Sequence, residues 1–133
     1  MILKGRKVMG GKAEGEALVS VEPVSFYGGV DPVTGCITEP GHCCCGENIT
    51  GKIFVFPTGK GSTVGSYVIY RMKKLRTAPA AIINVETEAI LATGCVIGDI
   101  PLVDKLDKNP VETIKTGDYV KVDADNGVIE VVD

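Results

Sequence analysis

Apolar residues along this chain occur in short runs or in alternation with polar residues, and both patterns are typical of β-strands. The pattern predicts strands over residues 2–9, 16–21, 52–56, 80–85, 95–97, 119–123 and 128–132. Two of them, 52–56 (KIFVF) and 80–85 (AAIINV), are mostly apolar and are interpreted as strands that are buried on both faces. Asn126-Gly127 lies between the last two strands and predicts a tight hairpin.

Helical spacing occurs in two places between these strands. Apolar residues recur every three or four positions over residues 63–74, with Ser62 at the expected N-cap position. A shorter helix is expected over residues 86–92, ended by Gly94. The middle of the chain is therefore β-α-β-α-β, flanked by antiparallel strands. We expect a strand-rich, mixed α/β fold with β/β/α layers, built as a single domain over residues 1–133.

Residues 22–48 form a long segment that is rich in Gly, Pro and Cys and shows no periodicity. Connections of this length in a small domain are generally functional or disordered. The apolar residues in the segment predict that it is ordered.

Composition narrows the class of protein. The chain has 133 residues, of which 44% are hydrophobic and 23% charged, as in a globular domain. Its net charge of -3 argues against nucleic acid as a partner. The sequence shows no apolar run of the roughly 18 residues that a membrane span needs and no signal peptide, so we expect a cytoplasmic protein that does not bind a membrane.

The five cysteines are an odd number in a chain without an export signal, which argues against a disulfide framework. Three of them, Cys43, Cys44 and Cys45, are consecutive, and three adjacent side chains do not easily direct their sulfurs to one tetrahedral ion. No CxxC pair is present. We therefore expect no metal ligand in this chain, and interpret the thiols as small side chains in a tight loop.

Two glycine–lysine pairs invite comparison with a phosphate-binding P-loop. After Gly51-Lys52 the required Ser or Thr is Ile53, and before Gly59-Lys60 the required earlier glycine is Phe54. Neither is a P-loop. The remaining candidate is the Lys60-Gly61-Ser62-Thr63 segment before the predicted helix, which is either an anion site or only a helix cap with a flexible approach.

His42 and Asp31 have two interpretations each. His42, the only histidine, is either a base paired with a neighbouring thiolate or a turn residue bound to the backbone. Asp31 either fixes the turn before Pro32 or contributes to a site.

Five segments occur together in a familiar order: GGVDPVTG, the loop histidine, KIFVFPTGKGSTVGSYVIY, APAAII and IGDIPLVD. In them the chain resembles the small subunits of aconitase X-type dehydratases over nearly its whole length. The resemblance implies a swivelling β/β/α domain, like the mobile domain of aconitases. It also implies a heterodimer with a large subunit that binds an iron–sulfur cluster, expected to be 4Fe-4S.

In the archaeal branch of this family the implied reaction removes water from (R)-5-phosphomevalonate and gives trans-anhydromevalonate 5-phosphate, in a route to isoprenoids. The resemblance makes Ser62 the proton acceptor. Lys60, Gly61, Thr63, His42 and Asp31 are then the candidates for binding a small phosphorylated hydroxy acid.

Removing a proton from an alcohol at neutral pH costs roughly 8 kcal/mol, and a helix N-terminus returns at most about 2 kcal/mol. We therefore expect Ser62 to become a base only when a partner covers it. Three alternatives remain: a subunit of a cis-3-hydroxy-L-proline-type dehydratase, a mobile carrier with a phosphohistidine at His42, and a non-catalytic binding module.

Overall fold

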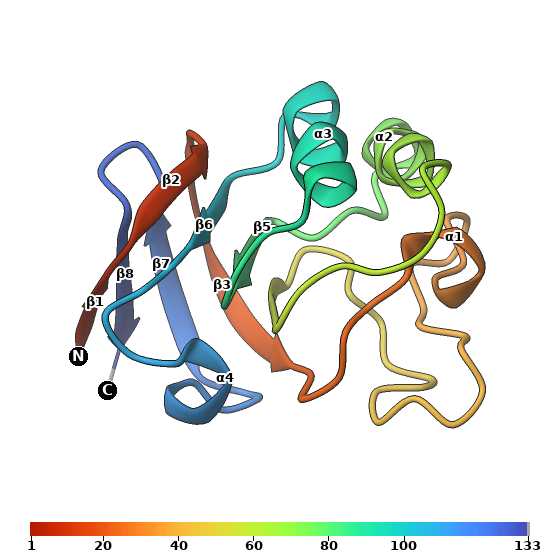
Figure 1. Cartoon of the computed structure of the whole chain (residues 1–133). Coiled ribbons are helices and arrows are strands. Elements are labelled where there is room, and N and C mark those ends of the chain that lie inside the picture. Colours follow the sequence, from red (N-terminus) through yellow and green to blue (C-terminus); the bar gives the residue numbers. More distant parts are fainter. Residues whose placement is uncertain (133) are drawn as a thin grey trace.

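The computed structural model describes residues 1–132, and its strands form an eight-stranded sheet in the order β1-β8-β7-β3-β4-β5-β6-β2 (Figure 1). The strands are Ile2–Lys4 (β1), Arg6–Met9 (β2), Lys12–Val19 (β3), Ile53–Phe56 (β4), Ala81–Asn84 (β5), Leu102–Asp104 (β6), Tyr119–Asp123 (β7) and Val128–Val132 (β8). The helices are Phe26–Gly29 (α1), Gly65–Leu75 (α2), Ala89–Gly98 (α3) and Pro110–Thr113 (α4).

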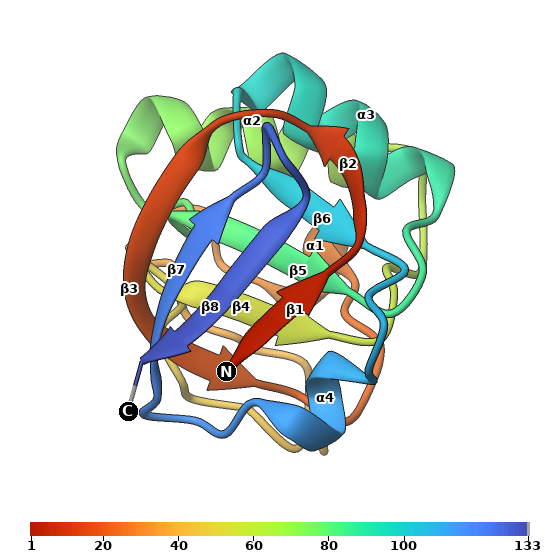
Figure 2. The ribbon, with the colours of Figure 1, turned by 90° about the vertical axis from the view of Figure 1, so that its left-hand side faces the viewer.

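The sheet folds into two layers. β4, β5 and β6 are parallel and form the middle layer, whereas β1, β8 and β7 are antiparallel and cross in front of them in Figure 2. β3 belongs to both layers, because it pairs antiparallel with β7 over its first part and parallel with β4 over its last part. Helices α2 and α3 cover the other face of the middle layer (Figure 1). The predicted β/β/α layers are confirmed.

Alternation along the middle strands explains the two cores. Phe54 and Phe56 in β4 join the apolar cluster under the helices, while Ile53 and Val55 join the cluster between the two strand layers. All four side chains are fully buried. A strand that is apolar at every position therefore supplies both cores at once, which is why β4 shows no polar face.

The predicted first strand, residues 2–9, is two strands in the structure. β1 pairs with β8 in the outer layer and β2 pairs with β6 in the middle layer, and the chain changes layer at Gly5. The prediction of one strand was wrong because sequence alternation does not show a change of partner. The next strand begins at Lys12 rather than at residue 16, since Lys12 to Glu16 pair with β7.

The prediction of a helix over 86–92 followed by a strand over 95–97 was also wrong. One helix, α3, runs from Ala89 to Gly98, and Glu88 caps it by accepting from the backbone N–H groups of Ile90 and Leu91. Gly94 does not end this helix. A Cβ there would lie 2.6 Å from Ile69 Cδ1 and 3.2 Å from Ser66 Cα of α2, so this glycine lets the two helices pack closely. The following strand is β6.

We expect Gly94→Ala to lower the free energy of unfolding by about 1 kcal/mol, because the overpacking cost of about 2 kcal/mol exceeds the gain in helix propensity of about 1 kcal/mol. Gly98→Ala is the matched control in the same helix. Its added Cβ meets nothing closer than 3.6 Å, so this variant should be as stable as the parent or slightly more so. Urea denaturation of both variants tests this, and equal effects of the two would contradict the close contact.

Other predictions agree with the structure. The strands at 119–123 and 128–132 pair as an antiparallel hairpin, as predicted. Residues 22–48 are ordered, as expected, and bury Val24, Phe26, Val30 and Ile37 in the core under the helices. Among residues 1–132, no helix combines the length and the apolar character that a membrane crossing requires.

Candidate functional site

The candidate site is the loop over residues 57–64, which leaves the carboxyl end of β4 and leads into α2. In open α/β sheets, ligands generally bind at this edge of the parallel strands. The loop is tied to the start of segment 22–48, because Lys60 donates its backbone N–H to the Val24 carbonyl at 3.0 Å and Val24 bridges to Gly59. Helix α2 begins at Gly65, two residues later than predicted.

Ser62 lies in this loop and is exposed to solvent. Its Oγ accepts a hydrogen bond of 3.2 Å from the Val64 N–H, so the side chain fixes the turn before α2 rather than the first turn of the helix. Within residues 1–132, the backbone N–H groups of Gly61, Ser62 and Thr63 donate to no other group. The loop therefore presents a hydroxyl together with three free N–H donors.

The glycine at position 61 is required by the backbone. Gly61 has a φ of +98°, and a Cβ there would lie 2.5 Å from Ser25 Oγ. Ser25 is itself fixed, since its hydroxyl donates to the Tyr27 carbonyl at 2.9 Å. A side chain at 61 would thus push the Ser62 backbone away from α1.

Lys60 is the cation nearest in sequence to Ser62, but its charge is already partnered. Its Nζ lies 3.1 Å from Glu39 Oε2 in the long segment. The lysine therefore ties the loop to segment 22–48 and offers little net positive charge to an alkoxide on Ser62.

The surface beside the loop is hollowed. A groove of about 200 Å³ between α2 and α3 is lined by Thr63, Ser66, Ala89, Ile90 and Thr93. A wider hollow of about 830 Å³ is lined by Pro57 and Thr58 at the start of the loop, and by Glu86, Glu88 and Glu112. The three carboxylates of the wider hollow disfavour an anionic ligand there, so the hydroxyl-lined groove is the better match for a phosphorylated molecule.

Exposed apolar side chains surround the loop. Val64, the last residue of the loop, is exposed, and Tyr67 is 69% exposed on the first turns of α2. Tyr27 is 56% exposed on α1, and its backbone N lies only 3.8 Å from the position that a Cβ at Gly65 would take. Large apolar side chains in this number around one polar loop indicate an interaction surface.

His42 lies in the long segment, and its side chain is only 1% exposed. Its Nδ1 accepts from the Cys44 N–H at 3.0 Å, so the proton is on Nε2, which donates to the Pro23 carbonyl at 3.1 Å. Both ring nitrogens are therefore engaged with the backbone. The described contacts include none between His42 and Ser62.

Asp31 holds its own turn. Its Oδ1 accepts from the Val33 N–H at 2.9 Å, and its carbonyl accepts from the Gly35 N–H at 2.8 Å. The turn is anchored by Thr77, which follows α2 and donates to the Pro32 carbonyl at 2.6 Å. Because Ser62 precedes α2 and Thr77 follows it, the structure does not bring Asp31 and Ser62 together.

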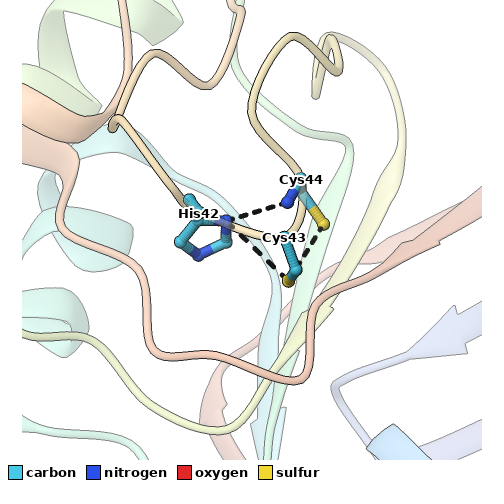
Figure 3. Close-up of side chains that lie close together, drawn as sticks. All are labelled: His42, Cys43 and Cys44. Atoms are coloured by element: carbon cyan, nitrogen blue, oxygen red, sulfur yellow. Dashed lines mark hydrogen bonds between the residues drawn. The ribbon is translucent and has the colours of Figure 1, made fainter.

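The thiols next to His42 differ in environment (Figure 3). Partial burial raises the pKa of Cys43, but hydrogen bonds with Ser20 and with the backbone of Val21 outweigh this effect and hold the pKa below its ordinary value. Burial, with Cys43 close by, raises the pKa of Cys44 to about 11. Sequence reasoning missed the contact with Ser20, which is 22 residues from His42, and nothing in the sequence pattern indicates it.

Residues 2–131 match the profile of the aconitase X swivel domain family. This chain belongs to that family. The observed layers, in which a mixed sheet is covered on one face by α2 and α3 (Figure 1), are consistent with this family.

Two curated relatives illustrate how far the aconitase X similarity extends. The phosphomevalonate dehydratase small subunit of Thermococcus kodakarensis is 58% identical over 100% of this chain and 98% of its own length. The protein of the same name from Methanocella arvoryzae is 55% identical over 98% of each chain.

Solved structures agree with this assignment. A chain in the crystal structure of Thermococcus kodakaraensis aconitase X, holo-form, superimposes with a TM-score of 0.96 at 57% identity and covers 100% of this chain and 99% of that one. A structural-genomics target solved by NMR in solution superimposes with a TM-score of 0.91 at 47% identity, with 100% of both chains covered.

Proposed function

We propose that this chain is the small subunit of a two-subunit dehydratase, which removes water from (R)-5-phosphomevalonate and gives trans-anhydromevalonate 5-phosphate. Two relatives named phosphomevalonate dehydratase small subunit, which are 55% and 58% identical over nearly their full length, support this choice of substrate. The observation that carries the role of this chain is the exposed loop at the carboxyl end of β4, which presents the Ser62 hydroxyl beside free N–H donors. Ser62 accepts the proton from the carbon next to the substrate carboxylate.

The isolated chain does not activate Ser62. An alkoxide costs roughly 8 kcal/mol at neutral pH, and the Val64 N–H is the one donor within residues 1–132 that contacts the hydroxyl. A charge-assisted hydrogen bond contributes about 1.5–3 kcal/mol. Lys60 adds little because Glu39 neutralises it. The remaining stabilisation comes from a second polypeptide that excludes water and supplies cations.

A large subunit that covers the loop provides this environment. The exposed Tyr27, Val64 and Tyr67 around the loop are suited to burial against it. Covering them places the loop in a dry site, where each hydrogen bond to a developing negative charge strengthens.

The substrate is an anion at both ends, and the loop is suited to one of them. The N–H groups of Gly61, Ser62 and Thr63 precede α2, whose dipole favours negative charge at this end. Lys60, two residues before Ser62, exchanges its ion pair with Glu39 for one with the phosphate or the carboxylate of the substrate. His42 and Asp31 act at a distance, by holding segment 22–48 against which the loop packs.

An iron–sulfur cluster, which the family resemblance implies for the complex, does not fit the residues of this chain. Such clusters are generally held by four thiolates, with imidazoles replacing two of them in one class. The largest group of possible ligands within residues 1–132 is His42, Cys43 and Cys44. We therefore assign the cluster to the large subunit.

The carrier alternative loses its basis in the structure. A phosphohistidine requires an imidazole nitrogen that a phosphoryl donor can reach. The His42 side chain is only 1% exposed, and both of its ring nitrogens are hydrogen-bonded to the backbone. The hydroxyproline dehydratase alternative shares the same loop and differs only in substrate.

Reconstitution tests the proposal. The purified chain and its large subunit are mixed under anaerobic conditions with (R)-5-phosphomevalonate or with cis-3-hydroxy-L-proline, and product formation is followed by mass spectrometry. The proposal expects turnover of the phosphorylated substrate by the complex only. Turnover of hydroxyproline instead would replace the substrate, and turnover by the isolated chain would contradict the need for a partner.

A further inference from the structure

A group of three possible metal ligands lies outside the loop of Ser62, in segment 22–48 (Figure 3). The ligand atoms of His42, Cys43 and Cys44 all lie within 4.8 Å of one another. The two sulfurs are 3.8 Å apart, and Cys43 Sγ is 3.9 Å from His42 Nδ1. Two sulfurs bound to one tetrahedral Zn²⁺ at 2.3 Å are separated by about 3.8 Å. The pair of thiols is thus already at the spacing that a shared ion requires.

The donor set selects the class of metal. Two thiols and one imidazole are borderline-soft to soft donors, which favour Zn²⁺ and Cu⁺ over Mg²⁺ and Ca²⁺. The Glu22 carboxylate lies 3.9 Å from His42 Nε2, which is the ring nitrogen on the edge opposite Nδ1. A hard cation that needs several oxygen ligands is therefore excluded.

The histidine is oriented as a metal ligand is. Metal-bound imidazoles generally donate their other ring N–H to a backbone carbonyl or a carboxylate, which fixes the tautomer. Here Nε2–H donates to the Pro23 carbonyl, and the Glu22 carboxylate lies 3.9 Å from the same nitrogen. The lone pair is on Nδ1, the ring nitrogen on the side of the thiols. Binding a metal exchanges the 3.0 Å hydrogen bond from the Cys44 N–H for a metal bond, with no change of tautomer.

The site is accessible from one side. His42 and Cys44 are buried, whereas Cys43 is exposed and gives an ion a path from solvent. Ser20 Oγ lies 3.4 Å from Cys43 Sγ and can hydrogen-bond to a bound thiolate or to a water in the fourth position. Cys45, although adjacent in sequence, is exposed and is not in this group.

From this geometry we infer that His42, Cys43 and Cys44 form a site for one Zn²⁺ ion, with a water as fourth ligand. Each thiol releases its proton to solvent as the metal–sulfur bond forms. The third separation, between the His42 nitrogen and Cys44 Sγ, is at most 4.8 Å and shortens when the ion binds. The sequence indicated no metal ligand because three adjacent sulfurs do not converge. The fold instead uses two of them with the imidazole.

The test is a Zn²⁺ titration of the reduced, metal-free full chain in competition with a chromophoric chelator. We expect one ion per chain. Cys43→Ser and His42→Gln should each weaken binding by at least about 100-fold, whereas the matched control Cys45→Ser should change it less than about threefold. Co²⁺ in place of Zn²⁺ should give a thiolate-to-metal charge-transfer band that Cys43→Ser weakens and Cys45→Ser leaves unchanged.

Circular dichroism confirms folding of each variant, and Cys43→Ser carries the test if the buried His42 variant unfolds. Equal losses of affinity in Cys43→Ser and Cys45→Ser would overturn the inference in favour of nonspecific binding by thiols. A titration in which only Cu⁺ binds would overturn the assignment to Zn²⁺. Neither result depends on dehydratase activity, so the proposed function is tested separately.

Discussion

Replacing Ser62 by alanine should lower kcat of the reconstituted complex by about 1,000-fold and leave KM nearly unchanged. A positioned proton acceptor generally contributes 10²–10⁴-fold to the rate, so about 10³ is the expected loss. KM should stay unchanged because, in our proposal, the backbone N–H groups of Gly61 and Thr63, rather than the hydroxyl, bind the anionic end of the substrate. Steady-state kinetics with saturating large subunit measure both constants.

Thr113→Ala is the control for this variant, because it removes a hydroxyl of similar size from α4, outside the loop. It should leave both constants unchanged. Gel filtration shows whether each variant still binds the large subunit. A Ser62→Ala complex that assembles normally and retains more than a tenth of the parent kcat would remove the proton acceptor from the proposal.

Asp104→Asn should lower the free energy of unfolding by about 2–3 kcal/mol at neutral pH. The Asp104 side chain is fully buried at the end of β6. Its two oxygens accept from Arg6 Nε at 2.9 Å and Nη2 at 2.8 Å, and Oδ2 also accepts from the Thr87 N–H at 2.8 Å. These bonds link β2 to β6 and hold the turn before α3, so the variant loses one charge and part of three hydrogen bonds.

The effect depends on pH in a direction that the environment of Asp104 fixes. Burial raises the pKa of this carboxyl, but the hydrogen bonds from Arg6 and Thr87 outweigh it and hold the pKa below its ordinary value. A depressed pKa in the folded state stabilises the protein above the unfolded-state pKa of about 3.9, and this stabilisation disappears as the pH falls through the folded-state value. The parent and Asp104→Asn should therefore converge in stability in acid.

Urea denaturation at neutral pH and at successively lower pH measures this convergence. Asp107→Asn is the matched control, because Asp107 is exposed and its carboxylate accepts, within residues 1–132, only from the Lys4 N–H, at 3.2 Å. It should change the free energy of unfolding by less than about 0.5 kcal/mol. A difference between parent and Asp104→Asn that is constant with pH would contradict the assigned role of the charge.

Local patterns in the sequence were enough for the middle of the fold. Strands at 52–56 and 80–85 were predictable because a buried run between turn residues has few alternatives, and the hairpin because Asn126-Gly127 determines a turn. Gly94 shows the limit of this reasoning. A glycine that ends a helix and a glycine that allows two helices to touch look the same in one sequence, and only the contact with Ile69 distinguishes them.

In the site, too, local features could be predicted from the sequence and tertiary contacts could not. The GKGST segment and the exposed hydroxyl of Ser62 were indicated by the sequence, since the position of a loop between a strand and a helix is a local property. The pairing of Lys60 with Glu39 and the contact of Ser20 with Cys43 join residues that are about 20 positions apart. Such contacts depend on how segment 22–48 folds back, which no periodicity in that segment reveals.

The most direct test of the proposed proton acceptor is a crystal structure of the complex of this chain with its large subunit and bound substrate. We expect the Ser62 oxygen to lie about 3–3.5 Å from the carbon next to the substrate carboxylate, in a closed interface that contains Tyr27 and Tyr67. A substrate bound elsewhere, with Ser62 still open to solvent, would contradict it.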